Sequence, residues 1–218
     1  MRCLKRIPED VDFATGALAE PLSAAIQAIY TAQPRLGDVC VVLGLGFQGL
    51  VILQGIKKSG ASLVVGVDIV DSKLALAKGL GADMVIDTTK EDVVTRVLEV
   101  TDGKGADLVI EAVGRSETVN QASAMLRKGG TLAMFGWVTR PALINLSDWH
   151  TKSLVPLILK IPDYTRKMPW AEKGFQLIHN GIIEVRRLVT DEFRLNDVSK
   201  AFIKYDTDPN VVKVAITP

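Results

Sequence analysis

The sequence predicts an α/β protein, a doubly wound parallel sheet of the Rossmann type with helical layers on both faces. Short continuous runs of Val, Ile and Leu recur along the 218 residues, as in strands that are buried on both faces of a parallel sheet. Helical patterns separate these runs, and repeated strand–helix alternation favours right-handed crossovers. The segment Val39–Asp68 contains a strand, a glycine turn, a helix and a second strand that ends on an acid.

Six strands are expected where short apolar runs are bounded by glycine, polar or acidic residues. In chain order they are Val39–Leu43, Leu63–Val67, Met84–Ile86, Asp107–Glu111, Gly130–Phe135 and Ser153–Leu159. Helices are expected between them, because apolar residues recur there at intervals of three or four. These helices are Phe47–Ser59 and those with the apolar faces Leu74–Leu80, Val93–Leu98 and Val119–Leu126.

Both ends of the chain extend beyond this six-stranded unit. An amphipathic helix, Ala17–Tyr30, precedes the first strand and has Pro21 near its first turn. The elements expected after the sixth strand are a helix over about Tyr164–Asn180, a short strand at Arg187–Val189, a helix over Leu195–Lys204 and a strand at Val211–Ile216. We expect these flanks to pack against something other than the nucleotide sheet.

The glycine turn has the spacing of a dinucleotide-binding fingerprint. Gly44 permits the tight turn out of the first strand, Gly46 lets the backbone approach a pyrophosphate, and Gly49 lets the helix pack closely on the sheet. The phosphates are expected at the free N–H groups of residues 46 to 49, which include Phe47 and Gln48, at the positive end of the helix.

The acid at the end of the second strand favours NAD over NADP. Asp68 can accept hydrogen bonds from both hydroxyls of the adenosine ribose, whereas a 2′-phosphate would face its carboxylate with no neighbouring Arg. The alternative interpretation is an ordinary strand-to-helix turn in which Asp68 is a solvated cap.

Composition excludes several classes of function. The net charge of +1 gives no electrostatic basis for binding nucleic acid or an anionic membrane, and no apolar run approaches the ~20 residues of a membrane span. Cys3 and Cys40 are the only cysteines, so no disulfide framework is expected, and a cytoplasmic location fits. Cys40 is expected to be a buried, small apolar residue.

Five segments, in matching order and spacing, resemble the C-terminal two-thirds of zinc-type medium-chain alcohol or polyol dehydrogenases. They are Ala19–Ile29, Gly37–Leu50, Gly103–Gly114, Leu126–Trp137 and Leu188–Pro218. The resemblance implies an NAD-dependent oxidoreductase, in which zinc polarises the substrate oxygen while the nicotinamide takes the hydride. It divides the chain into a junction of the catalytic domain (1–34), an NAD-binding Rossmann domain (35–162) and C-terminal elements returning to the catalytic domain (163–218).

The resemblance also implies further cofactor contacts. Asp68, Ile69 and Lys73 correspond to positions near the adenosine ribose. The two loops expected to contact the cofactor are Ala112, Val113 and Gly114 on the adenosine side, and Phe135, Gly136 and Trp137 near the nicotinamide.

No catalytic residue is predicted in this chain. The family's N-terminal domain would supply a cysteine and a Gly-His-Glu segment as zinc ligands, and His150 and His179 lie in neither context. Glu20 corresponds to a possible remnant of a zinc-site position, but it is better interpreted as an acid at a helix N-terminus. We therefore expect NAD binding without bound zinc, and doubtful catalysis by the chain alone.

Two alternative functions remain open. The chain could be a non-enzymatic module that senses NAD(H) or binds a partner, or it could be another Rossmann enzyme such as a methyltransferase. A homodimer through the sixth strand, Ser153–Lys160, is expected because that apolar edge would otherwise be unpaired, although Pro156 limits the pairing. Apolar residues that would face a missing domain are expected to be exposed; they are Leu22, Ile26, Ile29, Val214 and Ile216.

Overall fold

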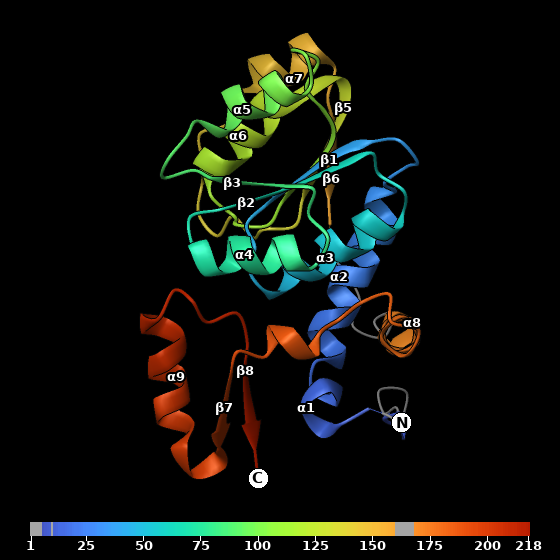
Figure 1. Cartoon of the computed structure of the whole chain (residues 1–218). Coiled ribbons are helices and arrows are strands. Elements are labelled where there is room, and N and C mark those ends of the chain that lie inside the picture. Colours follow the sequence, from blue (N-terminus) through green and yellow to red (C-terminus); the bar gives the residue numbers. More distant parts are fainter. Residues whose placement is uncertain (1–5, 10, 160–167) are drawn as a thin grey trace.

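The predicted fold class is confirmed. A computed structural model describes residues 6–9, 11–159 and 168–218. Its main feature is a six-stranded sheet in the order β3-β2-β1-β4-β5-β6, in which every pairing is parallel (Figure 1). The strand order reverses at β1, between β2 and β4, as in doubly wound nucleotide-binding folds.

All six predicted strands are present. They are β1 (Val39–Leu43), β2 (Leu63–Asp68), β3 (Met84–Asp87), β4 (Ala106–Glu111), β5 (Leu126–Met134) and β6 (Val155–Ile158). Leu126, which we predicted on a helix face, instead opens β5: it pairs with Ala106 ahead of a register shift, and its side chain is buried. The last residue of the predicted sixth strand, Leu159, lies just beyond β6.

Helices cover both faces of the sheet. Figure 1 shows α2 (Ala19–Ala32), α3 (Phe47–Lys58) and α4 (Asp71–Gly79) on one face, and α5 (Val93–Val100), α6 (Ser116–Met125) and α7 (Leu146–Lys152) on the other. The sequence analysis missed α7. Trp149 Nε1 of α7 donates to Ser123 Oγ of α6 at 2.8 Å, and Lys152 Nζ donates to two carbonyls at the end of α6. These long-range bonds hold a segment whose own apolar pattern is weak.

A helix outside the sheet layers covers part of α2 that the sequence analysis expected to be exposed. Helix α8 (Met168–His179) packs against α2, and Gly174 brings its backbone close to the Leu22 side chain. Leu22 is therefore fully buried and Ile26 is 4% exposed, so the prediction that these two are exposed is wrong. Ile29 is half-buried, and the predicted helix start at Tyr164 lies outside the described residues.

The C-terminal elements form a separate small unit (Figure 1). Strands β7 (Asp191–Arg194) and β8 (Val214–Thr217) pair in parallel, and α9 (Val198–Thr207) connects and contacts both. Helix α1 (Phe13–Gly16) contacts β8. Short 3₁₀ turns, η2 (Arg186–Leu188) and η3 (Leu195–Asp197), flank β7.

The predicted strand at Arg187–Val189 is wrong. That stretch lies mostly in the η2 turn, where Leu188 is fully buried in the core and the side chain of Arg187 pairs with Glu184 and lies against Gly79 of α4. Strand pairing begins only at Asp191, opposite Val214. Ile216 is 40% exposed, as predicted, whereas Val214 is half-buried.

Among the described residues, no helix has both the length and the apolar character needed to cross a membrane.

Acid stability should depend on the carboxylate at the end of β3. Hydrogen bonds from Lys90 and Thr89 lower the pKa of Asp87 from 3.8 to about 2. A depressed pKa in the folded state contributes stability above the unfolded value, and this contribution is lost as pH falls from about 4 to about 2. We expect Asp87→Asn to make the loss of stability across that interval shallower, as measured by urea unfolding at each pH. Parallel curves for parent and variant would contradict this assignment.

Candidate cofactor-binding site

The site lies at the carboxyl ends of the central strands. Leu43, the last residue of β1, pairs with Val67 of β2 and with Glu111 of β4, so these three strands end level with one another. The strand order reverses at β1, and open α/β sheets bind ligands at such a reversal point.

The glycine turn has the geometry that a dinucleotide fingerprint requires. Gly44 has φ +98°, and a methyl group there would lie 2.7 Å from Val113 Cγ2. A methyl group at position 49 would overlap the Gly44 carbonyl oxygen. In contrast, a methyl group on Gly46 would meet nothing within 4 Å. The turn is therefore tightly packed at its base and open in front of Gly46.

The open space faces the N-terminus of α3. The first N–H groups of an α-helix lack an intrahelical acceptor, and the N-cap of α3 is Gly46, which has no side chain to bond them. Phe47 is buried, and the Gln48 amide oxygen is buried without a hydrogen-bond partner among the described residues. The arrangement fits a pyrophosphate held by backbone N–H groups and the helix dipole.

Asp68 is held rigidly beside this turn. Its Oδ2 accepts a hydrogen bond from the Leu45 N–H at 2.7 Å, and its Oδ1 accepts from the N–H groups of Ile69 at 2.8 Å and Val70 at 3.1 Å. A carboxylate has about four acceptor positions. Three of them are used by the backbone, which leaves about one for a ribose hydroxyl in this arrangement.

Two further residues lie near the predicted ribose position. Ile69 follows Asp68 directly and is 64% exposed. Lys73 is half-buried in the first turn of α4. Their contact with a cofactor remains a prediction.

Two later loops meet at the same edge. Gly114 has φ +85°, and a methyl group there would lie 2.7 Å from the Trp137 carbonyl oxygen. The loop 112–114 also touches the glycine turn through Val113 and Ala112. Val113 is 41% exposed and Trp137 is 70% exposed. The structure thus brings together the glycine turn, loop 112–114 and loop 135–137.

Sequence analysis missed Glu111 as a site residue. It is fully buried at the end of β4, and its Oε1 accepts hydrogen bonds from the N–H groups of Val113 and Gly114 and from the Thr118 hydroxyl. A sequence signal did exist. The three strands β2, β3 and β4 each end on an acid, in the sequences VGVD, MVID and LVIE.

The described residues do not fit a catalytic zinc ion. Among residues 6–9, 11–159 and 168–218, no three His, Cys, Asp or Glu side chains are grouped so that they could hold a metal. Glu20 is exposed in the first turn of α2, His150 is exposed on α7, and His179 ends α8. Cys40 is fully buried in the core, as predicted, and this burial raises the pKa of its thiol to about 12. We assign no chemical step to a metal.

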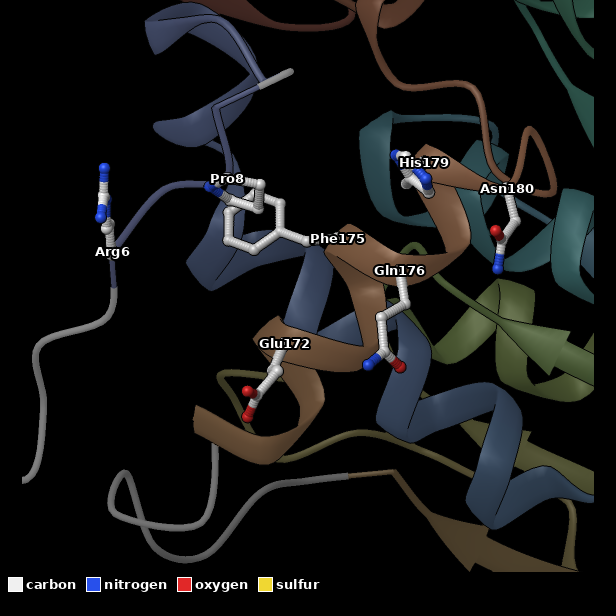
Figure 2. Close-up of a pocket in the computed structure, with 7 residues that line it drawn as sticks. All are labelled: Arg6, Pro8, Glu172, Phe175, Gln176, His179 and Asn180. Atoms are coloured by element: carbon white, nitrogen blue, oxygen red, sulfur yellow. The ribbon is translucent and has the colours of Figure 1, made fainter.

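Two hollows lie away from the cofactor edge. One is a hollow of about 570 Å³ beside α8. Figure 2 shows the residues that line it, among which Phe175 lies next to Pro8. It is lined by Arg6, Pro8, Glu172, Phe175, Gln176, His179 and Asn180. A second hollow, of about 310 Å³, lies among α2, α3 and α8. Neither of these two hollows is lined by a residue predicted to bind the cofactor.

The sheet order and the glycine turn place this chain in the class of Rossmann-type α/β proteins. The family described as zinc-binding dehydrogenase matches residues 49–157, half of the chain. The chain belongs to this family, and the resemblance inferred from its sequence is confirmed.

Individual relatives agree with this family. The chain is 31% identical over 215 residues to YdjJ of Escherichia coli (strain K12), an uncharacterized zinc-type alcohol dehydrogenase-like protein, covering 96% of this chain and 60% of the relative. It is 34% identical over 199 residues to sorbitol dehydrogenase of Rattus norvegicus, covering 90% of this chain and 54% of that enzyme. Among solved structures, a dehydrogenase assigned to the zinc-binding class from Sinorhizobium meliloti 1021, bound to NADP, gives a TM-score of 0.87 at 26% identity, covering 97% of this chain and 61% of that one. The chain thus spans between 54% and 61% of the length of these relatives.

Proposed function

We propose that this chain is the NAD(H)-binding part of an alcohol or polyol dehydrogenase. The observation that carries the proposal is the Asp68 carboxylate, held 2.7 Å from the Leu45 N–H beside an open glycine turn. Membership of the zinc-binding dehydrogenase family supports a redox role for the bound nucleotide. In the proposed division of the chain, residues 35–162 bind the cofactor, and residues 1–34 and 163–218 belong to the catalytic-domain side.

The residues of the edge would each have a distinct task. NAD, when bound, would supply the hydride acceptor. The N–H groups at the start of α3 would hold its phosphates, and Asp68 would fix the adenosine ribose. Val113 and Trp137 present apolar surface at the same edge, which would exclude water from the bound nucleotide.

The choice of NAD over NADP rests on Asp68. One related structure was solved with NADP, so family membership does not decide this point. In this chain a 2′-phosphate would approach a carboxylate that three backbone N–H groups hold in place. The resulting like-charge contact disfavours NADP.

Fluorescence titration of the purified chain with NADH and NADPH tests the proposal. We expect NADH to bind at least roughly tenfold more tightly, since a like-charge contact costs more than 1.4 kcal/mol. S-adenosylmethionine serves as the comparison ligand. Binding of S-adenosylmethionine without NADH would favour the methyltransferase alternative instead.

We further propose that the chain alone binds NAD without oxidising alcohols. The support is the lack of a three-ligand metal group within the described ranges 6–9, 11–159 and 168–218. NADH formation from sorbitol and from simple alcohols can be followed by absorbance. Turnover that is proportional to bound zinc would contradict this part of the proposal.

A second candidate, an NAD(H)-sensing or partner-binding module, is favoured by the exposed apolar residues around α9. Leu195 is 62% exposed, Phe202 is 73% exposed and Ile203 is 62% exposed. Large apolar groups in one exposed region are typical of an interaction surface. Analytical ultracentrifugation with and without NADH distinguishes this candidate, which requires a change in assembly when NADH binds.

A dimer through β6 is also proposed. β6 is an edge strand, and its Val155 and Ile158 are 48% and 67% exposed. We expect Ile158→Lys to convert a dimer to a monomer in light scattering, because charge on an edge strand opposes pairing. Leu143→Lys, at a loop position that is 89% exposed, is the matched control and should leave the dimer intact. A parent chain that is monomeric at micromolar concentration would refute the proposal. The predicted interface ends at Lys160, which lies outside the described residues.

A further inference from the structure

The buried carboxylate of Glu111 has no role in the function proposed so far. It is fully buried, yet one oxygen accepts three hydrogen bonds: from Val113 N–H at 2.9 Å, from Gly114 N–H at 2.8 Å and from the Thr118 hydroxyl at 2.7 Å. Successive backbone N–H groups of this kind form an anion-binding concavity, or nest. Here the protein's own carboxylate occupies the nest.

The same residue also holds the second loop. The Glu111 main-chain carbonyl accepts hydrogen bonds from the N–H groups of Phe135 and Gly136, both at 2.8 Å. Its other carboxylate oxygen, Oε2, is buried and has no hydrogen-bond partner in the described part of the chain. A methyl group on Gly136 would lie 2.7 Å from this oxygen and would overlap the Gly114 nitrogen. Only glycine therefore fits between Glu111 and loop 112–114 at this position.

These contacts connect Glu111 to the whole candidate site. Loop 112–114 packs against Gly44 of the glycine turn, and Gly114 packs against the Trp137 backbone. A displacement of the Glu111 side chain would therefore release loop 112–114 directly, and would disturb loop 135–137 through the contact of Gly114 with the Trp137 backbone. Burying a carboxylate with one unpaired oxygen costs folding free energy. Glu111 lies where the glycine turn, loop 112–114 and loop 135–137 meet, so a role in ordering this site would account for that cost.

We propose that Glu111 is a positioning residue that sets the two loops, 112–114 and 135–137, against the glycine turn for cofactor binding. This inference rests on the proposed NAD(H)-binding function. Glu111 is buried beneath the loops, and it acts through their backbone rather than by touching the cofactor.

The test compares two ligands and one isosteric variant. Glu111→Gln keeps the side-chain shape but removes the charge and places an amide donor at one of the two oxygen positions. NADH would reach both loops, whereas 5′-AMP would reach the glycine turn, Asp68 and loop 112–114 but not loop 135–137. We expect the variant to bind NADH about tenfold more weakly, the lower end of what a hydrogen bond to a charged group contributes, and 5′-AMP within about threefold of the parent. A purely structural role would weaken both ligands equally, and equal losses or no loss would overturn the inference.

A second measurement does not depend on the cofactor. Hydrogen exchange should accelerate at the N–H groups of Val113 and Gly114 in Glu111→Gln, because these two donate to the side chain, with β1 and β2 unchanged. If the parent binds neither ligand, the proposed function fails, and this measurement still decides whether Glu111 orders the loops. If Glu111→Gln does not fold, Thr118→Val removes one of the three donors, and Thr118→Ser, which keeps the hydroxyl, should restore NADH binding. Identical NADH binding by the Val and Ser variants would then count against the proposal.

Discussion

Gly49→Ala should abolish NADH binding and destabilise the chain. The new methyl group would overlap the Gly44 carbonyl oxygen, which is backbone and is itself fixed by the strand-to-helix turn. Neither α3 nor the turn can move without changing the open space in front of Gly46. Overpacking of this kind costs about 3 kcal/mol or more, since no flexible side chain can move aside. Urea unfolding and NADH titration measure the two effects.

Gly55→Ala is the matched control on the same helix. Its methyl group would overlap the Ile29 side chain, whose end can rotate. We expect a smaller loss of stability and unchanged affinity for NADH. Gly46→Ala adds a complementary test, since nothing in the protein lies within 4 Å of its methyl group. It should fold like the parent but bind NADH weakly, and normal binding by Gly46→Ala would refute the proposed position of the phosphates.

Asp68→Ala should weaken NADH binding by about 1–3 kcal/mol, or roughly 5- to 150-fold. The substitution removes an acceptor for the ribose and also releases the Leu45 N–H from its 2.7 Å hydrogen bond. The variant should further lose most of its preference for NADH over NADPH, because the opposing charge is gone. Titration with both nucleotides measures affinity and preference together.

Asp83→Ala separates the two consequences of losing an aspartate. Asp83 also accepts a backbone hydrogen bond, from the Val64 N–H at 2.8 Å, and it pairs with Lys57 at 2.5 Å. It lies at the opposite, amino end of the sheet, just before β3. We expect this variant to lose stability while its NADH affinity stays the same. Equal losses of NADH affinity in the two variants would show that Asp68 acts only through the fold.

Much of the candidate site could be predicted from sequence because its parts are local. The glycine spacing and the acid after the second strand lie within Val39–Asp68. Parallel strands with their carboxyl ends at one edge then bring Gly44, Asp68 and the loop after β4 together. The role of Glu111 was missed, because its hydrogen bonds depend on how two loops fold back over one side chain.

The sequence by itself determined which six segments form strands, that these strands form a parallel sheet, and at which edge of the sheet a nucleotide would bind. These follow from short-range hydrophobic periodicity and from glycine and acid at fixed spacings. Only the tertiary structure decided that α8 buries Leu22, that η2 replaces a predicted strand, and that Glu111 joins two loops. The physical reason is that burial and hydrogen-bond partners depend on which distant segments pack together, and local periodicity carries no information about such long-range contacts.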